Sequence, residues 1–266
     1  MSKKRHPGRR APIFDRHRVG SAAVTTLSYE YRSGHVVPEH LHDQDQLVHA
    51  VRGVMTVGTA RGMWVVPPHR AVWIPARLPH TIAMSGVVTM KTLYLLPGLA
   101  RGLPRDCCVL HVSPLLRELV LHACNFEALD SKVPEQARVV GIVLDQLSVA
   151  GSVPLQLPTP RDPRALRVAK LLLDDPGEPR PLEALCAVAG ASKRTVEWIF
   201  EADTGLTFGK WRQQLGLLHS IRSLAAGESV TSAALSAGYG TPSAFISMFR
   251  RALGTTPGRY FASSAR

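Results

Sequence analysis

Two groups of hydrogen-bonding side chains stand near the end of the chain, each shortly after a glycine, Gly190 or Gly238. Arginine can bond to both major-groove acceptors of guanine, and glutamate can accept a hydrogen bond from cytosine. Serine and threonine can cap the helix that would present such side chains. We therefore predict two DNA-contacting helices, whose contact residues are Ser192, Lys193, Arg194, Thr195, Glu197 and Trp198 in the first, and Thr241, Ser243, Ala244, Ser247, Arg250 and Arg251 in the second.

The two groups differ in what they offer to a nucleic acid. Arg194 suits guanine, Glu197 suits cytosine, and Trp198 suits a thymine methyl group or a sugar edge. The second group combines small side chains with Arg250 and Arg251, which suits close approach and phosphate contact. We expect the first group to carry more of the sequence discrimination.

A helix–turn–helix around each group would position these side chains. The first unit spans 181–200 and the second 230–250, and a glycine at the tight bend carries no side-chain penalty. A long helix from about 207 to 226 joins them. One such pattern also suits a generic helical hairpin, but two, with turn glycines 48 residues apart, favour DNA binding. The apolar anchors of the contacting helices are Val196, Ile199, Phe200, Phe245 and Phe249.

The net charge of +12 is distributed unevenly over the 266 residues. Residues 1–18 have an excess of six positive charges, residues 19–160 of one, and residues 161–266 of five. A nearly neutral middle between basic ends suits a polyanion-binding part joined to a domain with another task. We interpret residues 1–18 as a flexible basic arm that adds phosphate contacts.

The remaining chain divides by pattern. From 19 to about 96 it is rich in β-branched and aromatic residues and interrupted by Gly and Pro, which predicts short strands in a sandwich or small barrel. Ser113-Pro114 and Pro134 then begin two helices, which either cover an edge of the barrel or form the seam of a homodimer. Residues 151–160 contain three prolines and are the expected linker to an all-α domain over 161–266.

Cysteine usage and hydropathy indicate the compartment. The four cysteines lack metal-finger spacing and follow no secretory leader, so we expect reduced thiols and a cytoplasmic protein. The adjacent Cys107 and Cys108 are interpreted as small buried residues rather than as a redox sensor. No apolar run approaches the roughly 18 residues of a membrane helix.

The stretch from Asp162 to Tyr260 resembles the DNA-binding domain of the AraC/XylS family of bacterial transcription regulators. The resemblance implies seven helices, with two recognition helices in successive segments of the major groove. Trp198 and Gly216 depart from it, because relatives often place Arg there. The matching residues are Ala234–Tyr239, Ser243–Phe245, Phe249–Arg251 and Gly254–Tyr260.

The front of the chain resembles the two cupin motifs, which implies a small β-barrel with a pocket in its mouth. Gln46 replaces the motif's glutamate, Arg77 replaces a glycine, and Met84 replaces an asparagine. The matching residues are Gly34, His40, His42 and Gly53, then Gly62, Pro68, Pro75, Pro79 and His80.

The histidines of these motifs have two interpretations. His40 and His42 are two apart, so on a strand they point the same way, and with His80 they would offer three imidazoles to a divalent transition metal such as zinc, iron or nickel. Gln46 would be a poor fourth ligand because it brings no charge. Alternatively, the histidines line a metal-free effector pocket. Trp64, Trp73 and Tyr94 would line that pocket or pack in the core.

Together these features predict an α+β protein with an N-terminal cupin-like β-barrel domain over 19–150 and a C-terminal domain with two helix–turn–helix motifs. We expect a sequence-specific transcription regulator rather than an enzyme, controlled by a small molecule in the cupin pocket. Its partners would be double-stranded DNA, RNA polymerase if it activates, and a second copy of the chain. The alternatives are a metal-dependent cupin enzyme with an appended DNA-binding domain and a nucleoid-type protein without sequence preference.

Overall fold

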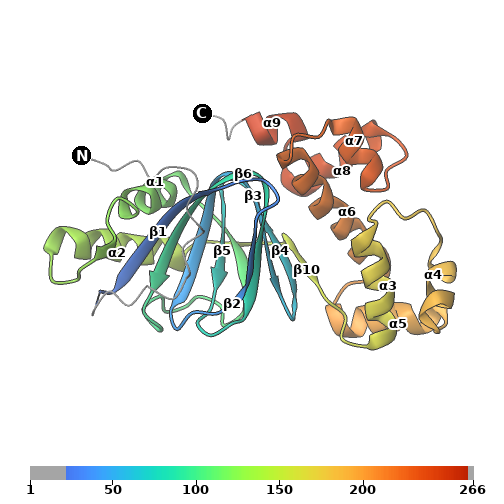
Figure 1. Ribbon diagram of the computed structural model, residues 1–266, viewed down its shortest axis with the longest axis horizontal. Helices are drawn as coiled ribbons and strands as arrows, with labels where there is room; N and C mark the ends of the chain where they lie inside the picture. Colours follow the sequence, from blue (N-terminus) through green and yellow to red (C-terminus); the bar gives the residue numbers. More distant parts are fainter. Residues whose placement is uncertain (1–21, 263–266) are drawn as a thin grey trace.

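The structure, a computed structural model, describes residues 22–262. A sheet-rich N-terminal domain and a helical C-terminal domain lie side by side (Figure 1). This arrangement confirms the predicted two-domain α+β class. The predicted basic arm over 1–18 lies outside the described residues.

The N-terminal domain is built on one folded sheet. The pairing order is β8-β1-β6-β3-β5-β7-β9, with β2 on β6, β4 on β3 and β10 on β4. Within the described residues the two ends of this path do not pair, so the predicted barrel is open, although its fold is cupin-like. The strands are β1 (Val24–Tyr31), β2 (Val36–His40), β3 (Asp45–Thr59), β4 (Gly62–Val66), β5 (Arg70–Ile74), β6 (His80–Leu95), β7 (Cys108–His111), β8 (Ala128–Leu129), β9 (Ser152–Val153) and β10 (Gln156–Pro158).

The long strands β3 and β6 each take part in two layers. The register of the β3–β6 ladder shifts near Gly53 and Gly86. Both glycines adopt the left-handed conformation (φ 73° and 72°), which favours glycine, and both strands bend there. The first layer contains β1, β5, β7, β8 and β9 with the start of β3 and the end of β6. The second layer contains β2, β4 and β10 with the end of β3 and the start of β6. The bend therefore stacks two halves of one sheet.

Two helices, α1 (Pro114–Ala123) and α2 (Pro134–Ser148), cover the first layer. Ser113 caps α1 as predicted, because its side chain accepts a hydrogen bond from the Leu116 amide. Leu116, Val140 and other apolar residues of the helices pack on Leu47, Leu93 and their neighbours in the sheet. Covering the sheet is thus what these helices do within one chain.

The segment 151–160, predicted as a linker, is paired along part of its length. β9 extends the first layer beside β7, and β10 extends the second layer beside β4. The three prolines interrupt periodicity in the sequence but leave enough amides for two short ladders. The connection between the domains is therefore attached to the sheet.

The C-terminal domain has seven helices within the described residues, as the resemblance implies. The buried residues of its first helix are Ala165, Val168, Ala169 and Leu172, which lie on one face. The helices are α3 (Pro163–Asp174), α4 (Leu182–Ala189), α5 (Lys193–Thr204), α6 (Phe208–Ala225), α7 (Val230–Ser236), α8 (Pro242–Leu253) and α9 (Pro257–Ala262).

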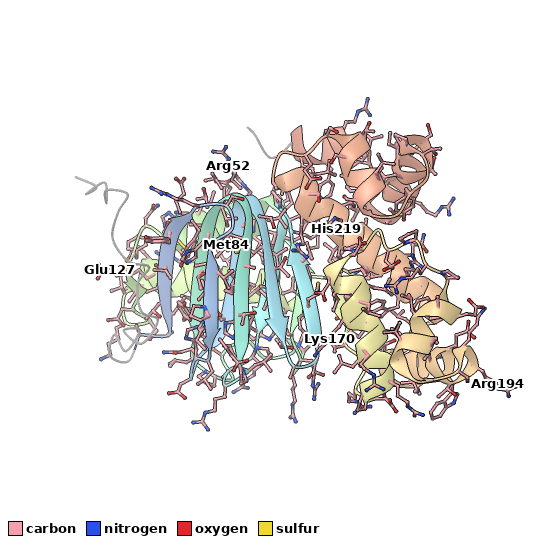
Figure 2. The ribbon with its side chains drawn as sticks, turned by 45° about the vertical axis from the view of Figure 1, so that its right-hand side comes forward. Arg52, Met84, Glu127, Lys170, Arg194 and His219 are labelled. Atoms are coloured by element: carbon pink, nitrogen blue, oxygen red, sulfur yellow. The ribbon has the colours of Figure 1, made fainter. Side chains whose placement is uncertain are left out.

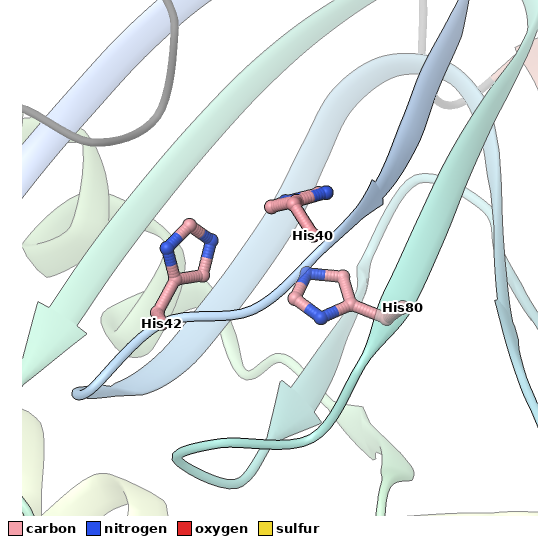
Figure 3. Close-up of side chains that lie close together, drawn as sticks. All are labelled: His40, His42 and His80. Atoms are coloured by element: carbon pink, nitrogen blue, oxygen red, sulfur yellow. The ribbon is translucent and has the colours of Figure 1, made fainter.

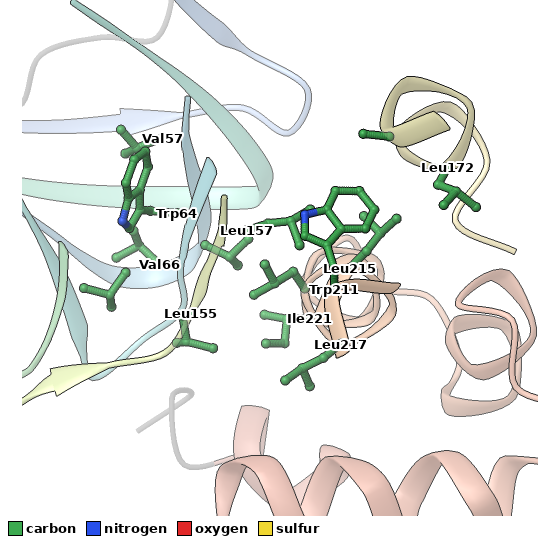
Figure 4. Packing of buried hydrophobic residues seen from close by; sticks show 14 of the residues in the cluster. Val57, Trp64, Val66, Leu155, Leu157, Leu172, Trp211, Leu215, Leu217 and Ile221 are labelled. Carbon is green, nitrogen blue, oxygen red and sulfur yellow. The ribbon is translucent and has the colours of Figure 1, made fainter. Parts of the chain in front are cut away.

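Helix α6 joins the two domains as well as the two helix–turn–helix units. It contacts β3, β4, β6 and β10, and its apolar side chains meet Leu155 and Leu157 (Figure 4). Trp211 Nε1 donates to the Pro158 carbonyl at 2.7 Å. Phe208, Trp211 and Leu217 of α6 are all buried, because the helix packs against both the sheet and the other helices of its own domain.

Within residues 22–262, no helix is long and apolar enough to cross a membrane.

Candidate DNA-binding surface and histidine cluster

The predicted turns and caps of the helix–turn–helix units are present. Gly190 (φ 67°) and Gly238 (φ 82°) adopt the left-handed conformation at the bends. The Ser192 side chain accepts from the Thr195 amide at 3.1 Å, and the Thr241 side chain accepts from the Ala244 amide at 3.3 Å. The sequence therefore determines where α5 and α8 begin.

The buried faces of α5 and α8 leave the predicted contact residues on the outside. Val196, Ile199 and Phe200 hold α5 in the core, and Phe245 and Phe249 do the same for α8, as predicted. Trp198 is 69% exposed, so this large aromatic side chain lies on the surface of α5, as predicted. The contact residues on the exposed side are Ser192, Lys193, Arg194, Glu197, Trp198, Thr241, Ser243, Ala244, Ser247, Arg250 and Arg251, and Thr195 is half-buried.

The predicted contact residues of α5 differ in whether they already bond to other residues of the chain. Lys193 Nζ lies 2.8 Å from Glu183 Oε1, and this hydrogen bond raises the pKa of Lys193. The hydroxyl groups of Thr195 and Ser192 form a hydrogen bond of 2.8 Å. Arg194 projects outward at the edge of the domain (Figure 2). Of the first group, Arg194, Glu197 and Trp198 are exposed and take no part in these hydrogen bonds.

A cavity that the sequence did not reveal lies between β10, α6 and α8. Its volume is about 430 Å³, and its walls combine apolar residues such as Leu217 and Met248 with the cations Lys210 and Arg251. Its residues come from three separated stretches, 154–158, 204–217 and 248–252, so no local pattern signals it. Arg251 thus borders both this cavity and the predicted DNA surface.

The three predicted histidines converge between the two layers of the sheet (Figure 3). The ring centroids of His40 and His80 are 4.3 Å apart, and those of His40 and His42 are 4.9 Å apart. His80 is 1% exposed and His42 is 8% exposed. Residues 40 and 80 are brought together because the end of β2 pairs with the start of β6.

The tautomers of two of these rings are determined by the backbone. His40 Nδ1 donates to the Pro38 carbonyl and His80 Nδ1 donates to the Leu78 carbonyl, both at 2.8 Å. A carbonyl oxygen only accepts, so the proton is on Nδ1 and the lone pair is on Nε2. Burial lowers the pKa of His80 to about 4 and also lowers the pKa of His40, which keeps both rings neutral at pH 7.

The other predicted pocket residues lie in different surroundings. Gln46 is fully buried and pairs in register with Tyr94, whose ring centroid is 5.0 Å from that of His42. Trp64 Nε1 donates to the Gln156 side chain at 3.2 Å, and Trp73 Nε1 donates to the Pro104 carbonyl at 3.1 Å. Trp73 packs in the cluster beneath α1 and α2. Tyr94 is thus beside the histidines, while Trp64 is tied to β10.

The cysteines are all free thiols. Burial raises the pKa of Cys108 to about 11 and raises that of Cys107 further. Thiols that remain protonated at pH 7 are poor nucleophiles. Their environment supports the interpretation of these cysteines as packing residues.

A buried histidine outside the cluster gives a pH prediction. Burial lowers the pKa of His49 to about 4 in the folded chain, compared with about 6.5 when unfolded. The unfolded chain therefore binds more protons between these values, so the free energy of unfolding should fall as pH decreases from 6.5 to 4, by up to about 3 kcal/mol from this group. Urea unfolding at pH 7, 6, 5 and 4 measures the slope. The His49→Gln variant should flatten it in part, since His80 titrates in the same window, and an unchanged slope would contradict the assignment.

Comparisons with known proteins match both domains. Residues 23–194 match the family model of the AraC-like ligand binding domain, and residues 185–263 match that of a helix-turn-helix domain. The chain is 33% identical over 248 residues to the HTH-type transcriptional regulator NimR of Escherichia coli (strain K12). The aligned region covers 93% of this chain and 90% of NimR. It is also 33% identical over 104 residues to the HTH-type transcriptional regulator RipA of Corynebacterium glutamicum, covering 39% of this chain and 31% of RipA.

Solved structures are similar over the same regions. The structure of ToxT from Vibrio cholerae strain SCE256 with a bound unsaturated fatty acid covers 91% of this chain and 95% of ToxT, at 11% identity and a TM-score of 0.37. The DNA-binding domain of AdpA in complex with a target DNA covers 39% of this chain and 93% of that domain, at 33% identity and a TM-score of 0.36. On the family-model matches and the full-length relative, the chain belongs to the AraC family of helix–turn–helix transcription regulators, with an N-terminal ligand-binding domain.

Proposed function

We propose that this regulator reads its target sequence with α5 and α8 in successive segments of the major groove. The observation that carries the proposal is the pair of capped helices whose apolar faces are buried and whose N-terminal polar residues face solvent. A recognition helix of this kind contacts base edges with its first residues. The basic excess of residues 161–266 suits the phosphate backbone on either side.

The two helices have different tasks in this proposal. Arg194, Glu197 and Trp198 on α5 provide base contacts, whereas Lys193 is partly held by Glu183. On α8, the small Ser243, Ala244 and Ser247 allow close approach, and the exposed Arg250 and Arg251 contact phosphates. Sequence discrimination therefore rests mainly on α5.

The Arg194→Ala variant tests this division. It should relax the preference at one base pair by about 1–3 kcal/mol, because a bidentate contact to guanine is lost. Arg250→Ala should instead weaken binding to all sequences alike and reduce the salt dependence by about one released counterion. The measurement is selection of DNA from a random pool, followed by affinities for single-base variants at several salt concentrations.

Arg138→Ala is the matched control for these variants. Arg138 is exposed on α2 and pairs with Glu135, so its loss should change neither affinity nor preference. If Arg194→Ala left the preference unchanged at every base, α5 would not be the discriminating helix. Uniform binding of all sequences by the unmodified chain would instead favour a nucleoid-type protein.

Control by a small molecule completes the proposal. The ligand-binding domain touches α6, the helix between the two DNA-contacting units, so a ligand that alters the sheet alters the helix that positions both. We further infer that the protein acts in the cytoplasm as a regulator without catalytic turnover, and that it contacts RNA polymerase if it activates. Leu115 on α1 and Ile142 on α2 are exposed apolar residues on the outer face of the sheet domain, which suits a homodimer seam.

A further inference from the structure

The histidine cluster, defined as His40, His42 and His80, has the geometry of a metal site. Within residues 22–262 these are the three side chains of the His, Cys, Asp and Glu types whose ligand atoms all lie within 4.8 Å of one another. Two are buried and His40 is half-buried, so bulk water has limited access. The set combines residues from the end of β2, the following loop and the start of β6.

The surroundings of the rings prepare them as ligands. Metal-binding histidines almost always donate their second ring N–H to a carbonyl or carboxylate, which orients the ring. His40 and His80 both make such a bond at 2.8 Å. The Nε2 atom of His80 is buried and accepts no hydrogen bond from the described residues. A ligand at this atom would remove the cost of burying an unsatisfied polar group.

The chemistry of the donors selects the kind of ion. Three neutral imidazoles suit zinc, nickel or copper, whereas calcium, magnesium and manganese prefer oxygen ligands. Non-haem iron oxygenases use two histidines and one carboxylate, and this cluster contains no carboxylate. Gln46, at the position of the motif's glutamate, adds no charge. Zinc is the abundant borderline ion that accepts three histidines with a fourth position for water or another ligand.

We propose that His40, His42 and His80 bind a zinc ion and that this ion is an input signal of the regulator. The proposal rests on the proposed function and specifies one ligand of its N-terminal domain. The ligand atoms of the cluster lie within 4.8 Å of one another, and zinc–nitrogen bonds are about 2.0–2.1 Å long, so one ion can reach all three histidines. A bound zinc ion therefore holds the three elements that carry the histidines at one point.

The second layer provides the route from this site to DNA. His40 and His80 both belong to strands of the second layer, and it is this layer that packs on α6. α6 in turn precedes the second helix–turn–helix unit and follows the first. Zinc bound at the end of β2 and the start of β6 thus biases the position of the helix that both units share, and shifts the population toward the state that it fits better.

The first experiment measures the binding of zinc to the full chain. Chelator-treated protein is titrated with zinc in competition with a chromophoric chelator, and bound metal is counted by mass spectrometry. Cobalt provides a visible spectrum that reports nitrogen ligation. We expect one zinc per chain, and a rise in Tm of roughly 5 °C or more at a hundredfold excess over Kd. Absence of stoichiometric zinc would overturn the proposal.

Variants assign the ligands. His40→Ala and His80→Gln should each weaken zinc binding by more than the roughly 10–100-fold that loss of an outer-shell partner costs. His40 is half-buried, so its variant remains informative if replacement of the deeply buried His80 prevents folding. His122→Ala, in an exposed histidine of α1, is the matched control and should bind zinc unchanged. Equal affinities in all three variants would place the metal elsewhere.

The second experiment measures the signal. The affinity for DNA selected from a random pool should change on zinc addition by roughly 5–150-fold, the usual range of allosteric coupling, and the change should be lost in His40→Ala and retained in His122→Ala. Zinc binding without any change in DNA affinity would overturn the role as an input. If the chain bound no DNA with or without zinc, the proposed function would fail, while the zinc titration would still judge the site.

Discussion

Replacement of Trp211 by alanine should destabilise the chain by about 3–5 kcal/mol, the usual cost of deleting a large buried aromatic. Trp211 is 1% exposed, and its ring centroid lies 5.1 Å from that of Phe200 in α5. The substitution would also remove the donor to the Pro158 carbonyl, which attaches α6 to the strand β10. Both the core of the C-terminal domain and its connection to the sheet would be weakened. Urea unfolding followed by circular dichroism measures the loss.

Two further substitutions separate packing from hydrogen bonding and from DNA contact. Trp211→Phe keeps an aromatic ring but removes the Nε1 donor, so it should cost less than Trp211→Ala. Trp198→Ala is the matched control, because Trp198 is an exposed tryptophan on α5. Its stability should change by no more than about 0.5 kcal/mol, while its affinity for DNA should fall. Equal destabilisation by Trp198→Ala and Trp211→Ala would contradict the assigned positions.

Replacement of Gly86 by alanine should disturb the contact between the two domains. Gly86 lies at the bend of β6, and a Cβ atom there would be 2.3 Å from the Ala225 carbonyl oxygen at the end of α6. No side chain can be accommodated unless the helix or the bend moves, because the obstacle is backbone. Added to the strain of its left-handed conformation, the overlap should cost about 1–3 kcal/mol. Unfolding measurements and protease sensitivity of the 151–160 segment detect the change.

Gly34→Ala is the control for conformational strain. Gly34 has a similar φ of 78°, but a Cβ atom there would meet nothing within 4 Å. It should therefore show the strain of a left-handed alanine, about 1 kcal/mol, without loosening α6 from the sheet. If both variants had the same protease sensitivity, the Gly86–Ala225 approach would not be holding the domains together.

The local features of the C-terminal domain followed from the sequence alone. Ser192 and Thr241 cap their helices, and Gly190 and Gly238 form the bends, because these tasks depend on a residue's own side chain and backbone freedom. The outward position of Trp198 followed from helical periodicity in the same way. The glycine at position 216, by contrast, is explained only by the tertiary structure. A Cβ atom there would lie 3.0 Å from the Ala237 carbonyl oxygen, so a larger residue would be crowded.

The sequence predicted a domain of short strands at the N-terminus, but it did not predict that the sheet stays open. Frequent glycines and prolines indicated short strands, and the resemblance to the cupin motifs implied the cupin-like fold. Whether the sheet closes depends on pairings between distant strands, and the pairing order leaves it open within the described residues.

The two-domain class, the tandem helix–turn–helix units and the outward-facing residues of α5 and α8 thus followed from the sequence, because composition, turn residues, helix caps and hydrophobic periodicity are local patterns. Tertiary structure alone decided that α6 is shared by both domains and that β10 ties the connection to the sheet. It also brought His40 and His80 to a centroid distance of 4.3 Å across forty residues of chain. Such contacts depend on the summed packing of many segments, which no local pattern records.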